Sequence, residues 1–117
     1  MTTNPSTPRR AVAYLRSNVG AAEDSIERQR QAVRDYAARR GLDLTAVYVD
    51  QGVSGAAPLE ERPVVVRLLT DARRGEFERL VVTDFARLTR RQPLDAAELR
   101  ALREAGVQIE TTDGEQE

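Results

Sequence analysis

The chain has 117 residues, 40% apolar and 32% charged, and this balance predicts one globular domain. It contains no cysteine and no histidine, which excludes disulfides, thiolate metal sites and a serine–histidine–aspartate triad. The net charge is −1, so a strongly basic DNA-binding domain is not indicated, although all 18 basic residues are arginine.

Alternating short apolar runs and helical patterns predict a β-α-β-α-β-α-β order. In chain order we expect a strand at 10–15, a helix at 25–41, a strand at 42–50, a helix at 63–75, a strand at 79–84, a helix at 93–106 and a strand at 107–112. Strands separated by single helices indicate a mainly parallel sheet of about four strands in an α/β fold.

The ends of the chain are polar. We expect a disordered N-terminal arm at 1–8, one domain at 9–113 and a polar tail at 114–117, without a C-terminal DNA-binding domain. The sequence shows no signal peptide and no apolar run of membrane-spanning length, which predicts a cytoplasmic protein that contacts no membrane.

Polar and charged residues follow three of the expected strands. These residues are Arg16 and Ser17 after the first strand, Asp50, Ser54 and Arg62 after the second, and Asp84, Arg87, Arg90 and Arg91 after the third. Because parallel strands end at one edge of the sheet, several guanidinium groups should gather there, and phosphate is the ligand that arginine binds bidentately. The alternative is that these arginines are solvated or pair with the nearby carboxylates Asp50, Asp84, Glu60 and Glu61.

Several segments carry a more specific signal. They are "YLRSN", "SIERQRQAVRDYAARRG", "YVDQGVSG", "ERPVVVRLLTDARRGEFERLVV" and "ARLTR". In this order and spacing, from about Arg9 to Asp113, the chain resembles the catalytic domain of the serine recombinases, the resolvase/invertase family. The resemblance implies helices on both faces of the sheet. It also implies attack of a serine hydroxyl on DNA phosphate, strand exchange within a tetramer, and no metal or other cofactor.

The resemblance also implies roles for individual residues. Arg16 matches the arginine at the end of the family's first strand, and Arg62 matches the arginine of its "DRP" segment, here "ERP". Arg87 and Arg90 match the arginines of its "DRLxR" segment, here "ARLTR". Gln29 and Asp50 match a glutamine of the first helix and an aspartate after the second strand. Ser17, Arg16, Arg87 and Arg90 are therefore the candidate catalytic residues, and Asn18, Gln29, Asp50 and Arg62 the candidate phosphate-binding or supporting residues.

The sequence departs from the family pattern at the nucleophile. The family has serine two residues after the strand-end arginine, whereas here that position is Asn18 and the serine, Ser17, comes one place early. Alternate residues of a strand share a face, so Arg16 and Asn18 should lie together and Ser17 opposite, unless a bulge re-aims it. Asparagine cannot form the covalent ester, but its amide can donate a hydrogen bond to phosphate.

Three hypotheses follow from the sequence. The first is a recombinase catalytic domain in which Ser17 is a displaced nucleophile. The second is a non-catalytic recombinase relic or regulator that keeps the phosphate-binding arginines, with Ser17 only a strand-end hydroxyl bonded to backbone. In both we expect weak binding to DNA by this chain alone, and homo-oligomers or pairing with another recombinase. The third is a small-anion-binding α/β domain, although the sequence lacks a glycine-rich phosphate loop.

Overall fold

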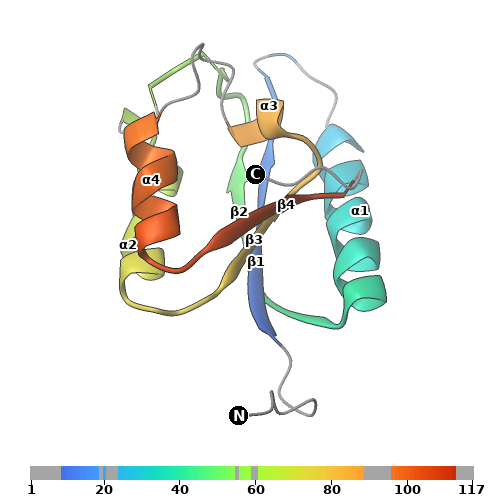
Figure 1. Ribbon diagram of the computed structural model, residues 1–117. Coiled ribbons are helices and arrows are strands. Elements are labelled where there is room, and N and C mark those ends of the chain that lie inside the picture. The colour runs from blue at the N-terminus through green and yellow to red at the C-terminus, as the bar shows by residue number, and fades with distance from the viewer. Residues whose placement is uncertain are drawn as a thin grey trace, which may run out of the picture.

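The computed structural model describes residues 9–18, 20, 24–54, 56–58, 61–88 and 96–112. Its elements in chain order are β1 (Arg9–Arg16), α1 (Asp24–Arg40), β2 (Leu42–Asp50), α2 (Pro63–Arg73), β3 (Arg79–Val82), α3 (Phe85–Leu88), α4 (Ala96–Glu104) and β4 (Gln108–Thr111). The predicted α/β fold is confirmed: the four strands are parallel, and helices cover both faces of the sheet (Figure 1). The expected arm at 1–8 and tail at 114–117 lie outside the described residues.

Several expected boundaries differ from the structure. β3 (Arg79–Val82) and α2 (Pro63–Arg73) each end two residues earlier than expected, and β4 (Gln108–Thr111) is one residue shorter at each end. β1 is one residue longer at each end than expected, because β2 pairs with it from Arg9 opposite Leu42 to Arg16 opposite Asp50. The segment after β3, expected to be only a connection, begins with the four-residue helix α3. At the start of α3 the Arg87 amide donates to the Asp84 carbonyl at 3.1 Å. The helix is only one turn long, so the sequence has no helical pattern of apolar residues that could predict it.

The order of strands in the sheet is β2-β1-β3-β4. The chain therefore moves from β1 in one direction to β2 and later in the other direction to β3, so the order reverses between β1 and β3. In open parallel sheets the crevice at the carboxyl ends of such a strand pair is where ligands bind. Here that position is occupied by the residues after Arg16 and by α3, which lies across this end of the sheet (Figure 1).

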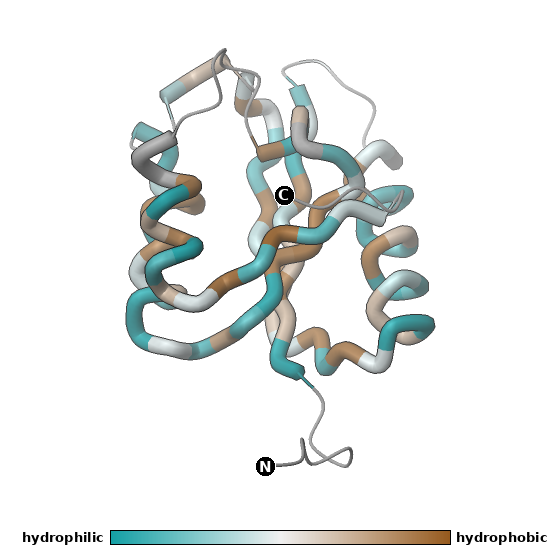
Figure 2. The backbone as a smooth tube through the Cα atoms, in the orientation of Figure 1, coloured by the Kyte–Doolittle hydropathy of each residue, from teal (hydrophilic) through white to brown (hydrophobic). Residues whose placement is uncertain are grey.

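The sheet separates two hydrophobic cores. On one face, Val12, Tyr14 and Leu80 pack with buried residues of α2 and α4, among them Leu68 and Leu102. Ala11, Ala13, Leu15 and Val81 face the other way and pack with Ile26, Val33 and Tyr36 of α1. The strands and the inward sides of the helices carry most of the hydrophobic residues (Figure 2). The alternation along β1 thus assigns Tyr14 and Arg16 to the α2–α4 face.

Gly41 and Gly75 lie just beyond α1 and α2, with φ of +69° and +73°, a region that glycine adopts without strain. The helices within the described ranges are all too short or too polar to cross a membrane.

Candidate functional site

Arg16, the last residue of β1, is fully buried, and its guanidinium donates hydrogen bonds to oxygens of the chain itself. Nε donates to the Arg87 carbonyl at 2.8 Å, and Nη2 donates to the Ala86 carbonyl at 2.9 Å. Nη1 donates to the Val53 carbonyl at 2.7 Å and to Asn18 Oδ1 at 2.6 Å. We call these four oxygens the Arg16 cage. The guanidinium that the sequence assigned to phosphate thus contacts protein oxygens in the free chain.

Gln29 of α1 fixes the backbone of Arg16. Its Oε1 accepts from the Arg16 amide at 3.1 Å, and its Nε2 donates to the Arg16 carbonyl at 2.9 Å. β3 pairs with β1 only as far as Ala13. Beyond that point, the side-chain amide of Gln29 bonds to the backbone of β1 as a neighbouring strand would. Gln29 is 5% exposed, so it supports the site from inside the protein.

Ser17 is 3% exposed and is held on the opposite side of the chain from the Arg16 guanidinium. Its amide donates to the Asp50 carbonyl at 3.0 Å, and its carbonyl accepts from the Val53 amide at 2.9 Å. Its hydroxyl oxygen accepts from the Gly52 amide at 3.2 Å. Ser17 therefore continues the pairing of β1 with the segment after β2, and its hydroxyl faces the turn at residues 51–52.

Asn18 lies on the opposite side of the chain from Ser17. As the alternation predicts, it shares a face with Arg16, and its amide oxygen contacts the guanidinium directly. Asn18 is partly exposed, whereas Arg16 behind it is fully buried. The side chain at the position where the resemblance predicts a nucleophilic serine is thus an amide, which cannot form a phosphoserine link.

Asp50 and Arg62 form a second buried group, joined by Tyr14. The Tyr14 hydroxyl donates to Asp50 Oδ2 and accepts from Arg62 Nη2. Arg62 Nε lies 3.8 Å from Asp50 Oδ2, and its guanidinium carbon lies 5.6 Å from the centroid of the Tyr14 ring. Burial, and then the hydrogen bond to Asp50, raise the pKa of the Tyr14 hydroxyl well above its ordinary value, so Tyr14 stays protonated.

Sequence reasoning did not assign Tyr14 to the site. The signal that could have found it is the spacing: Tyr14 and Arg16 are alternate residues of β1 and so share a face, and Asn18 continues the same spacing just beyond the strand.

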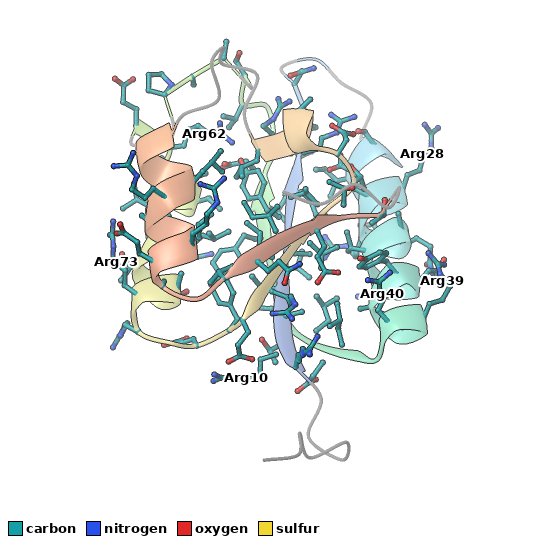
Figure 3. The ribbon with its side chains drawn as sticks, in the orientation of Figure 1. Arg10, Arg28, Arg39, Arg40, Arg62 and Arg73 are labelled. Carbon is teal, nitrogen blue, oxygen red and sulfur yellow. The ribbon has the colours of Figure 1, made fainter. Side chains whose placement is uncertain are left out.

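Two buried donors of Arg62 have no acceptor among the described residues. The residue is 2% exposed, and the two donors are its Nε and Nη1. It lies at the same end of the sheet as α3, whereas Arg10 lies at the opposite end, and Arg28 and Arg39 point away from α1 (Figure 3). Buried donors without acceptors are uncommon in folded proteins and call for a physical explanation.

Arg87 of α3 is the most accessible of the described candidate arginines, with 28% of its side chain exposed. Its Nε lies 3.7 Å from Asp84 Oδ2, and its Nη1 donates to the Arg16 carbonyl at 3.4 Å. The alternative that acids pair with these arginines therefore holds in part, for Asp84 with Arg87 and for Asp50 with Arg62. Arg90 lies outside the described residues, so its predicted role stays a prediction.

Comparison with known proteins places this chain in a family. The model of the resolvase N-terminal domain matches residues 11–117. The C-terminal catalytic domain of ISC1926 TnpA, an IS607-like serine recombinase, is 26% identical and superposes with a TM-score of 0.79, covering 91% of this chain and 69% of that chain. A search of curated proteins gave no match.

Two further solved structures share the fold. The N-terminal catalytic domain of TP901-1 integrase superposes with a TM-score of 0.75 at 24% identity, over 90% of this chain and 78% of that chain. A resolvase family site-specific recombinase from Streptococcus pneumoniae superposes with a TM-score of 0.77 at 21% identity, over 92% of this chain and 75% of that chain. Since the family model spans most of the chain, this protein belongs to the resolvase family and has the catalytic-domain fold of the serine recombinases.

Proposed function

We propose that this domain binds the DNA phosphate backbone within a recombinase assembly and does not itself cleave DNA. One observation carries the proposal: the hydroxyl of Ser17, the residue after Arg16, is buried and faces the Gly52 amide, while Asn18 contacts the guanidinium. An in-line attack requires the oxygen of the nucleophile to face the phosphorus atom. The amide of Asn18 offers no such oxygen, because a phosphoryl transfer needs a hydroxyl or another nucleophile that can lose a proton.

Binding without cleavage is supported by the arginines that remain. Arg87 is partly exposed at the switch point of the sheet, and Arg62 has two buried donors without an acceptor among the described residues. A phosphate oxygen is the strongest acceptor that such donors meet in DNA. The net charge of −1 indicates that the affinity of this chain alone is low, because nonspecific affinity for DNA depends on the number of phosphates neutralised.

The test uses the chain fused to a sequence-specific DNA-binding module of known site. Duplexes carry two inverted copies of that site around a randomised centre, and the products are separated on native and denaturing gels. The native gel should show the fusion bound, and the denaturing gel should show no protein–DNA adduct. An adduct that forms with the unchanged fusion and disappears in Ser17→Ala would overturn the proposal and make Ser17 a displaced nucleophile.

The same fusion tests the phosphate contacts. Arg87→Ala should weaken binding to all duplexes alike and reduce the slope of log affinity against log salt by about 1. Arg67→Ala is the charge-matched control, because Arg67 lies on α2 against the Tyr48 ring, at 5.3 Å from its centroid. Equal effects of the two substitutions would mean that Arg87 does not contact phosphate.

A second variant of the fusion tests whether only the nucleophile is missing from the site. Asn18→Ser places a hydroxyl at the family's nucleophile position, and an adduct formed only by this variant would mean that the nucleophile alone was lost. Absence of an adduct from Asn18→Ser would mean that the site has lost more than its nucleophile.

A further inference from the structure

The Arg16 cage joins segments that are far apart in the sequence. Asn18 follows β1, Val53 follows β2, and Ala86 and Arg87 belong to α3, which follows β3. One guanidinium therefore bonds to the chain at the carboxyl ends of three adjacent strands, with donor–acceptor distances of 2.6 to 2.9 Å. The acceptors of the cage are three backbone carbonyls and one side-chain amide, so only the amide differs with the amino acid at its position.

A guanidinium can join three segments in this way because its donors form a rigid planar fork. When one acceptor fixes the rotation of the fork, the positions of the other acceptors are fixed as well. A buried, permanently charged group also requires these acceptors, since a charge without partners is costly in the interior. Asn18 Oδ1 makes the shortest contact of the cage, at 2.6 Å.

The length of the asparagine side chain suits this contact. Its acceptor oxygen lies one bond farther from the backbone than a serine hydroxyl does, a difference of roughly 1 Å. A serine at this position, with the backbone unchanged, would place its oxygen beyond the usual hydrogen-bond range of 2.7 to 3.2 Å from Nη1. An aspartate would keep the acceptor at the same place and add a negative charge.

Two hydrogen bonds join Arg16 and Arg87, and each residue donates one of them. Arg16 Nε donates to the Arg87 carbonyl at 2.8 Å, and Arg87 Nη1 donates to the Arg16 carbonyl at 3.4 Å. The Arg16 guanidinium thus holds the backbone of α3, and the Arg87 side chain that this backbone carries is bonded to the main chain of Arg16.

We propose that Asn18 is a positioning residue: by accepting from Arg16 it holds the segment after β2 and the helix α3 in one arrangement, and so sets the position of Arg87. In this chain the residue at the nucleophile position thus stabilises the site from within. The inference goes beyond the proposed function, because the coupling exists in the free chain and requires neither DNA nor cleavage.

The experiment measures amide hydrogen exchange along the whole chain in the absence of DNA. The unchanged chain is compared with Asn18→Ala, Asn18→Ser and Asn18→Asp. Ser54→Ala is the control, because Ser54 is exposed after β2 and its hydroxyl accepts from the nearby Ala56 amide at 3.0 Å. Asn18→Ala should raise exchange roughly tenfold or more at both 51–54 and 85–88, because a hydrogen bond from a charged donor is lost. Exchange in α4 (Ala96–Glu104) should stay unchanged.

The aspartate variant distinguishes positioning from general destabilisation. Asn18→Asp should keep the protection of the unchanged chain at both segments, while Asn18→Ser should resemble Asn18→Ala. The proposal is overturned if Asn18→Ala affects only residues near position 18, if α4 loses protection equally, or if Asn18→Asp behaves as Asn18→Ala does. Should Asn18→Ala fail to fold, the comparison of Asn18→Asp with Asn18→Ser decides by the same criteria, and neither outcome depends on DNA binding.

Discussion

Tyr14 connects two buried charges, and its replacement by phenylalanine is expected to destabilise the fold strongly. The hydroxyl donates to Asp50 and accepts from Arg62, which are 5% and 2% exposed. A hydrogen bond to a charged group contributes about 1.5 to 3 kcal/mol, so the two bonds together contribute about 3 to 6 kcal/mol. Part of this loss is offset, because Arg62 Nε stays 3.8 Å from Asp50 Oδ2 and the aromatic ring stays in place.

We therefore expect Tyr14→Phe to lower the free energy of unfolding by about 2 to 4 kcal/mol. For a domain of this size that corresponds to a fall in Tm of about 8 to 16 °C. The assay is urea unfolding followed by circular dichroism, with the m-value checked for two-state behaviour.

Tyr48→Phe is the matched control, because the same atom is removed. The Tyr48 hydroxyl also donates to a carboxylate, but its partner Asp71 is partly exposed, so water replaces the lost bond and the cost should be about 1 kcal/mol or less. Equal losses for the two variants, or a Tyr14→Phe loss below about 0.5 kcal/mol, would refute the reasoning that Tyr14 bridges two desolvated charges.

Three further predictions concern stability. The chain has no histidine, cysteine or lysine, and burial raises the pKa of Tyr14, Tyr36 and Tyr48, so stability should be constant from about pH 8.5 to 9.5 and fall above about pH 10, where unfolded tyrosine loses its proton. Urea midpoints across this range, with tyrosinate absorbance as the titration signal, check it, and folded tyrosines that titrate near pH 10 would contradict it. Glu110→Ala should cost about 3 to 5 kcal/mol in urea unfolding, because buried Glu110 accepts from Tyr36 and lies 2.9 Å from Arg79 Nε, whereas Glu78→Ala, at an exposed pair with Arg10, should cost about 1 kcal/mol or less. Gly41→Ala should lower the free energy of unfolding by about 1 to 2 kcal/mol, because its φ is +69° while the space around it is open, and no loss would mean that the turn relaxes freely.

The sequence predicted the fold well because its signals are local. Alternating apolar runs and helical patterns fixed the order of elements, and Gly41 and Gly75 marked two helix ends correctly. The position of the site at the carboxyl ends of β1 and β3 followed from the parallel arrangement. The alternation along β1 also predicted that Asn18, and not Ser17, shares a face with Arg16.

The interior of the site could not be predicted in the same way. Three acceptors of the Arg16 cage are backbone carbonyls, and any residue at 53, 86 or 87 supplies a carbonyl, so the sequence carries no signal for them. Arginine at a strand end suggested phosphate, but its burial depends on how α3 and the loop after β2 pack over it. The role of Tyr14 likewise depends on two partners 36 and 48 residues away in the chain.

The most direct test of the account is the state of the Arg16 guanidinium in the free chain, measured by NMR with ¹⁵N and ¹³C labelling. We expect the Arg16 Nε proton to exchange slowly with water and to show a coupling through the hydrogen bond to the carbonyl carbon of Arg87. Arg67, exposed on α2, provides the reference for fast exchange. An Arg16 Nε proton that exchanges as fast as that of Arg67, with no such coupling, would contradict the account and return Arg16 to the role of a phosphate-binding side chain.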